Sequence, residues 1–411
     1  MMVINDNSSV LAPTTSTMAW DKRGAILLLL GVLSLLEVEL VGRLFLVEIV
    51  FAVIFVWCLL SKNARRDLPN LIRVAVPLIF IWLLAQVATD YYRSTPFEDY
   101  ARGWAKISFF CADLVAIGVL TQSRPKNIIL FVVGFCLSQI IVATFFFGGW
   151  GLWKFGYGMP LTTLFVIAAT HMQKKSVKYL ILAILIAVNL LFDFRSLAGF
   201  CLVATLAASY GDLHTSVHDA RARLRRAILW FGFAALVSFF FIQLYLVSEE
   251  LGYGSLVGQY ERSGAARNPL YGRLEFVIGL QAAMDSPIVG HGSWAKDFQY
   301  AYLMNLLVRE TKGDAGPIFD DLIPTHSYLI SAWVEAGIVG AIFWTFILIR
   351  TLRAFKIPVM LNITHLPFVS FYLAWFVWAI LFSPFGATER IYAATAIVLV
   401  SSMESIRLKV T

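Results

Sequence analysis

Residues 324–340 read PTHSYLISAWVEAGIVG, in which a histidine stands just before a long apolar run and a glutamate lies inside it. The run continues to about residue 349, so it reaches the ~20 residues that an α-helix needs to cross a bilayer. Comparable apolar runs recur along the whole chain, at about 24–40, 44–60, 71–89, 104–120, 127–147, 157–172, 178–192, 196–210, 227–247, 327–349, 367–383 and 391–405. The sequence therefore predicts an all-α polytopic membrane protein of about 12 transmembrane helices.

The composition supports a membrane location. Of 411 residues, 59% are hydrophobic and 14% are charged, against about a quarter charged in soluble domains. The four cysteines all fall inside apolar runs and none forms a CxxC pair, so we expect neither a disulfide framework nor a thiolate metal site. Residues 1–20 form a polar tail without a basic segment ahead of an apolar core, and we expect no cleaved signal peptide.

The distribution of basic residues predicts the orientation. The net charge is +7, and 20 of the 33 basic residues flank alternate ends of the apolar runs. The positive-inside rule makes that side cytoplasmic, with both termini on it, and it explains the charge without a nucleic-acid partner. Seven basic residues are predicted in short connections on the opposite side: Arg43, Arg93, Arg102, Lys106, Lys154, Arg195 and Arg390.

This orientation places one long connection, residues 248–325, on the outer face. It divides the chain into transmembrane helices 1–9 (21–247), the outer loop, transmembrane helices 10–12 (326–406) and a short cytoplasmic tail (407–411). Within the loop, GRLEFVIGLQAAMDSP (272–287) has apolar residues at 274, 277, 280 and 284, a helical spacing. We expect an amphipathic helix at the membrane surface, ended by Pro287 and the glycines that follow it.

His326 is the first candidate site residue. Pro324 should end any preceding helix, and Thr325 is the expected N-cap of the next one. The helix dipole disfavours a positive imidazolium at this position. A neutral imidazole could act as a general base; the alternative is a histidine that only caps the helix at the membrane interface.

Glu335 lies nine residues after His326. In a helix this is about 13 Å deeper and roughly half a turn away, so Glu335 cannot orient the imidazole directly. A carboxylate at that depth should face another helix, where it contacts a polar group. Gly337 and Gly340 would let a neighbouring helix approach closely.

Two arginines are candidates for binding an anion. Arg195 interrupts a stretch of about 33 residues that we interpret as two short spans joined by a minimal outer turn. Its guanidinium could hold phosphate oxygens through two donors, or it could pair locally with Asp193. Arg273 opens the predicted loop helix and is the second candidate, with an exposed helix-start arginine as the alternative.

The sequence does not suggest a metal or a cofactor. The six histidines are scattered, no HExxH motif occurs, and the adjacent Asp320 and Asp321 are a weak metal signal. No Walker A or GxGxxG motif occurs either.

The order and spacing of these motifs resemble the O-antigen ligase and O-antigen polymerase superfamily. The resemblance rests on an arginine at a tight outer turn, on GRLEFVIGLQAAMDSPIVGHG in the loop and on THSYLISAWVEAGIVG after it. It is most specific over about 190–210 and 270–345. This chain has Ser327 where the family often has Asn, and Phe194 where it often has Ser.

The resemblance implies a metal-independent glycosyltransferase of the bacterial inner membrane. It would move a glycan from undecaprenyl pyrophosphate to an acceptor hydroxyl at the periplasmic face, in O-antigen or exopolysaccharide biosynthesis. His326 would act on the acceptor, Arg195 and Arg273 would hold the pyrophosphate, and Glu335 would support them. The acceptor stays open between another lipid-linked repeat, a lipid A core and a protein, and the alternative class is a transporter or flippase of lipid-linked glycans.

Overall fold

The computed structural model describes residues 22–39, 42–146, 152–192, 194–214, 274–312, 321–355 and 365–410. The predicted apolar run at 227–247 and most of the first half of the outer loop lie outside these residues. So do Asp193 and Arg273.

The described chain is mostly helical, as predicted for an all-α membrane protein. Its helices are α1 (Lys22–Leu33), α2 (Leu46–Leu60), α3 (Lys62–Asp67), α4 (Asn70–Arg93), α5 (Phe97–Thr121), α6 (Pro125–Phe146), the π-helix η2 (Leu152–Tyr157), α7 (Gly158–His171), α8 (Lys175–Leu191), α9 (Arg195–His214), α12 (Leu274–Asp285), α13 (Phe298–Lys312), α14 (Tyr328–Ala354), α16 (Leu366–Phe382) and α17 (Ala387–Val410). Eleven of the twelve predicted runs coincide with helices.

Four described helices are long and apolar enough to cross a membrane: α4, α5, α6 and α14. The helices α2 and α16 are apolar but shorter. The first predicted run, 24–40, was wrong at its end. Residues Glu37–Glu39 form the strand β1, which pairs antiparallel with β2 (Arg43–Phe45) in a two-stranded hairpin.

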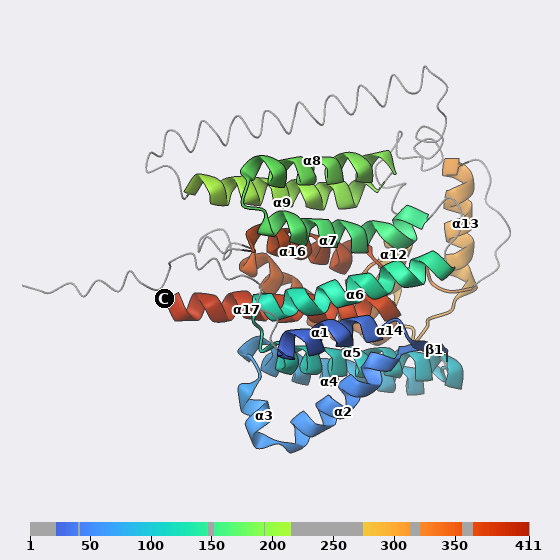
Figure 1. Cartoon of the computed structure of the whole chain (residues 1–411). Coiled ribbons are helices and arrows are strands. Elements are labelled where there is room, and N and C mark those ends of the chain that lie inside the picture. The colour runs from blue at the N-terminus through green and yellow to red at the C-terminus, as the bar shows by residue number, and fades with distance from the viewer. Residues whose placement is uncertain are drawn as a thin grey trace, which may run out of the picture.

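Most helices run side by side, and α13 stands across them at one end of the bundle (Figure 1). We call this the α13 end; the hairpin lies there as well, and the C-terminus lies at the opposite end. The closest helix pairs include α1 with α6, α9 with α16, α5 with α17 and α4 with α14. Large aromatic side chains fill the centre: Trp82 stacks on Phe343 at 5.4 Å, and Trp344 packs edge-on to Phe385 at 5.1 Å.

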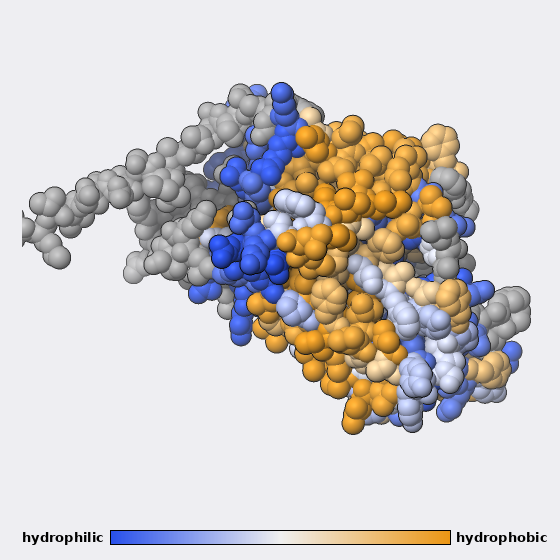
Figure 2. Space-filling view, turned by 90° about the horizontal axis from the view of Figure 1, so that it is seen from below, coloured by the Kyte–Doolittle hydropathy of each residue, from blue (hydrophilic) through white to orange (hydrophobic). Residues whose placement is uncertain are grey.

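The face of the bundle that carries α2 and α4 is largely apolar. Figure 2 shows a broad hydrophobic surface that lies between hydrophilic residues on two sides. Its exposed side chains include Val53 and Leu60 of α2 and Ile81 and Leu84 of α4. Water would penalise a patch of this size, whereas lipid chains would not. The surface therefore agrees with a membrane environment.

The loop helix was predicted in the right place, and most of the apolar side chains that predicted it do not pack into the bundle. The buried residues of α12 are Leu274, Ile278, Gly279, Ala282 and Ala283. The large side chains at 277, 280 and 284 are exposed instead. The small residues face α14 because they allow the two helices to approach closely.

Candidate functional site

His326 is exposed and lies just before α14. The predicted cap was wrong: Ser327, not Thr325, is the N-cap, and its Oγ accepts a hydrogen bond from the Ile330 amide at 3.1 Å. The same Oγ donates to the Ile380 carbonyl near the end of α16 at 2.9 Å. Thr325 instead packs beside Gly279 of α12. The start of α14 is therefore fixed to α16 one residue after the histidine.

Arg195 is exposed and is the first residue of α9. The turn that carries it is as short as predicted, since α8 ends at Leu191 and the Phe194 amide donates to the Asn189 carbonyl at 2.7 Å. The alternative pair of Arg195 with Asp193 falls outside the described residues, as does Arg273, which directly precedes α12 in the chain.

The starts of three helices converge on the last two turns of α16. Phe200 of α9 packs edge-on to Trp378 at 6.0 Å, and Phe276 of α12 contacts Phe382 at 5.7 Å. Ser327, at the start of α14, hydrogen-bonds Ile380. The segments that carry or adjoin the predicted site residues thus all contact one helix end, although at least 50 residues of sequence separate each from the next.

Glu335 makes the kind of contact predicted for it. Its carboxylate accepts two hydrogen bonds from Lys106 Nζ of α5, at 2.9 and 2.7 Å. The two residues are 7% and 5% exposed. The sequence interpretation placed Lys106 in an outer connection, which was wrong, because α5 begins at Phe97 and carries Lys106 well inside the bundle.

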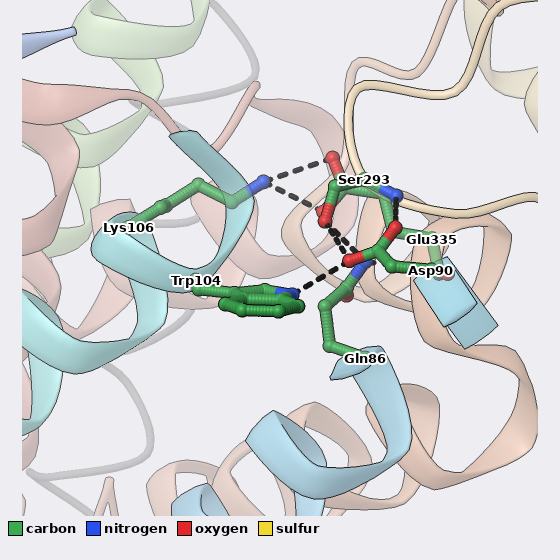
Figure 3. Close-up of polar contacts among 6 residues, drawn as sticks. All are labelled: Gln86, Asp90, Trp104, Lys106, Ser293 and Glu335. Atoms are coloured by element: carbon green, nitrogen blue, oxygen red, sulfur yellow. Dashed lines mark hydrogen bonds and ion pairs between the residues drawn. The ribbon is translucent and has the colours of Figure 1, made fainter. Parts of the chain in front are cut away.

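A hydrogen-bond network surrounds this ion pair (Figure 3). The Asp90 carboxylate accepts from the Ser293 amide and hydroxyl, both at 2.6 Å, and from Trp104 Nε1 at 2.7 Å. Gln86 Nε2 donates to Ser293 Oγ at 2.9 Å and to the Glu335 carbonyl at 3.4 Å. The network joins α4, α5, α14 and the segment after α12. Sequence reasoning missed it, although Asp90 and Lys106 both stood as charges at the edges of apolar runs.

The helix α14 is broken beside Glu335. Ala336 and Gly337 leave helical geometry, and Gly337 has φ +64°. The predicted approach of another helix to Gly337 was wrong, because the approaching segment is the turn after α12. A Cβ on Gly337 would overlap the Ile288 carbonyl.

A second buried ion pair lies at the α13 end. Arg390 of α17 donates to Glu48 of α2 through Nε and Nη2, at 2.9 Å each, and Nη2 also donates to the Arg43 carbonyl at 3.1 Å. Arg390 was predicted in an outer connection, and its burial corrects that prediction. The pair links the two ends of the sequence structurally. Neither of its residues is a sequence neighbour of His326.

Searches for similarity found no matching family model, no matching curated protein and no matching solved structure.

Proposed function

We propose that this chain is a metal-independent membrane glycosyltransferase that moves a glycan from undecaprenyl pyrophosphate to an acceptor hydroxyl. The reaction would take place at the periplasmic face of the bacterial inner membrane, in surface-polysaccharide biosynthesis. The observation that carries the proposal is the convergence of the starts of α9, α12 and α14 on the end of α16. These are the three segments whose motifs resemble the O-antigen ligase and polymerase superfamily.

In the proposed reaction His326 is the general base. It would take the proton of the acceptor hydroxyl as the oxygen attacks the anomeric carbon and the bond from that carbon to the pyrophosphate breaks. Arg195 and Arg273 would neutralise the charge that develops on the departing pyrophosphate, a task that suits planar two-donor groups. The exposure of His326 and Arg195 supports this assignment, because neither residue is buried inside the helix bundle.

The runner-up is a transporter or flippase of the same lipid-linked glycans. A transporter is expected to carry its ionisable binding groups near the membrane midplane, on interrupted helices. The break in α14 and the buried Lys106–Glu335 pair are the features that favour this second reading. The two functions differ in their product, since only a transferase makes a new glycosidic bond.

A transfer assay with purified protein and a lipid-linked glycan tests the proposal. His326→Ala should lower turnover by about 10²–10⁴-fold, the usual range for general acid–base catalysis. His326→Gln should be equally impaired, because an amide cannot take up the proton. The matched control is His171→Gln at the opposite end of the bundle, which should keep its turnover.

The arginines are tested in the same assay. Arg195→Lys and Arg273→Lys should each lower transfer strongly, because an ammonium cannot reproduce the guanidinium fork, whereas the exposed Arg66→Lys should not.

Wild-type activity in His326→Gln with an unchanged pH profile would show that His326 is not the base. Flipping of the lipid-linked glycan without any new bond would favour the transporter. The length and attachment of glycans in a deletion strain would then separate polymerase from ligase.

A further inference from the structure

The first two turns of α14, residues 328–335, form a short helical segment of their own. The segment ends at the break, where Ala336 and Gly337 are not helical. At its start the Ser327 hydroxyl donates a hydrogen bond to the Ile380 carbonyl of α16. His326 directly precedes Ser327. We propose that Lys106 and the turn 287–293 form a latch that holds this segment, and that they are positioning residues for His326.

The turn supplies the hydrogen bonds that the break removes from α14. The carbonyls of Val334 and Glu335 accept from the amides of His291 and Gly292, at 2.6 and 3.1 Å. Beyond the break, the Ile338 amide donates to the Pro287 carbonyl at 2.9 Å. A helix end needs such partners, so the direction of residues 328–335 depends on the turn.

The turn is itself held by α4. Thr89 Oγ1 donates to the Val289 carbonyl at 2.6 Å, and Arg93 donates to the Gly290 carbonyl at 3.0 and 2.8 Å. Ser293 hydrogen-bonds Asp90, which lies about one turn before Arg93 on α4. The long helix α4 therefore serves as the frame on which the turn rests.

Lys106 completes the latch from α5. Glu335 stands at the C-terminal end of the short segment, where the helix dipole disfavours a carboxylate. Lys106 provides the opposite charge at 2.7 Å in a buried site, so removing it leaves a buried carboxylate without its ion-pair partner. Release of Glu335 would free the segment at the end remote from His326 and would let His326 shift relative to α4, the helix that holds the turn.

Distances between spin labels test the latch without any activity. Labels on His326→Cys and on Arg73→Cys, an exposed position in the first turn of α4, span the bundle; the four native cysteines are buried. Lys106→Met should shift or broaden the distance distribution, and Lys106→Arg should restore it. The matched control is Arg350→Met, which breaks the Arg350–Glu404 pair on the other side of the break and should leave the distribution unchanged.

An unchanged distribution in Lys106→Met overturns the proposal. If Lys106→Met does not accumulate in the membrane, Ser293→Ala serves instead, because it removes the hydroxyl's hydrogen bonds to Asp90 and Gln86 and leaves no unpaired charge. An unchanged distribution in that variant overturns the proposal equally.

The catalytic consequence rests on the proposed function. If His326 is the base, Lys106→Met with His326 intact should lower turnover by up to about 10²-fold, as a misplacement of about 1 Å does, with little change in the KM for the donor. Lys106→Arg should recover most of it. A wild type without transferase activity would remove the function but not the latch, which the label distances decide alone.

Discussion

At the scale of single residues, glycine allows the polar network to form. Ser293 lies against Gly103 of α5, and a Cβ at that position would overlap Ser293 Oγ. The hydroxyl is already fixed by Asp90 and Gln86, so it has no free direction in which to move. The glycine is therefore needed for its size, not for an unusual backbone conformation.

Gly103→Ala should lower the stability of the protein by about 1–3 kcal/mol, the usual cost of overpacking. Gly199→Ala is the matched control, because a Cβ there meets nothing within 4 Å. The control should be neutral or stabilising by up to about 1 kcal/mol, since alanine is the better helix former. The unfolding midpoint of each variant in detergent measures the difference. Equal midpoints for Gly103→Ala and Gly199→Ala would mean that the network accommodates the added methyl group without a loss of stability.

At the scale of helices, the apolar runs and the helix positions could be predicted from the sequence, because each helix depends on the pattern of contiguous residues. The break in α14 could not be predicted in this way. Residues 335–337 continue an apolar run, and the break depends on a turn about 45 residues earlier that replaces its hydrogen bonds. The face of α12 that contacts α14 could not be predicted either, because that contact selects small side chains over large ones.

The candidate site shows the same division. The short turn before Arg195 and the exposed position of His326 before a helix follow from local sequence. The partner of Glu335 does not follow from local sequence, because Lys106 lies 229 residues away in the chain. Lys106 also stands near the start of its own apolar run, where an exposed residue was expected. The proposed chemical roles remain predictions.

The contact between α7 and α16 leads to a prediction about pH. Burial lowers the pKa of His365 to about 4. The ring of His171 lies 5.4 Å from the ring of His365, centroid to centroid, and its charge lowers this pKa further. Between about pH 6.5 and 4 the unfolded chain binds a proton that the folded chain does not, so stability falls as pH is lowered through this window. His365→Gln should show a shallower fall in the unfolding midpoint from pH 7.5 to 4.5. Equal slopes for the wild type and His365→Gln would contradict the assignment.

At the scale of the whole molecule, the two ends of the sequence are joined inside the bundle. Arg390 of α17 reaches Glu48 of α2 across 342 residues of sequence. A buried pair of this kind is costly to break from one side, because the remaining charge has no partner. The link joins α2 and α17 inside one bundle. The alternation of basic residues along the chain predicts on which side of a membrane each end of the chain lies.

Single cysteines tested with an impermeant reagent on intact cells check this orientation. Asn63→Cys on α3 and Lys174→Cys before α8 are exposed positions at predicted cytoplasmic ends, and they should react only after the cells are opened. Gln299→Cys on α13 and Ser94→Cys after α4 are exposed on the other side and should react from outside the inner membrane once the outer membrane is permeabilised.

The same experiment decides the predicted ninth span, which lies outside the described residues. Ala222→Cys and Ser255→Cys stand on either side of the apolar run at 227–247. If that run crosses the membrane, Ala222→Cys should be protected and Ser255→Cys should react from outside. An even number of crossings is needed to bring both termini to the cytoplasm, so labelling of Ala222→Cys from outside would contradict the count of twelve. If the first eight spans hold and Ser255→Cys is protected as well, the run does not cross. His326 would then lie on the cytoplasmic side, where a lipid-linked donor could not meet a periplasmic acceptor.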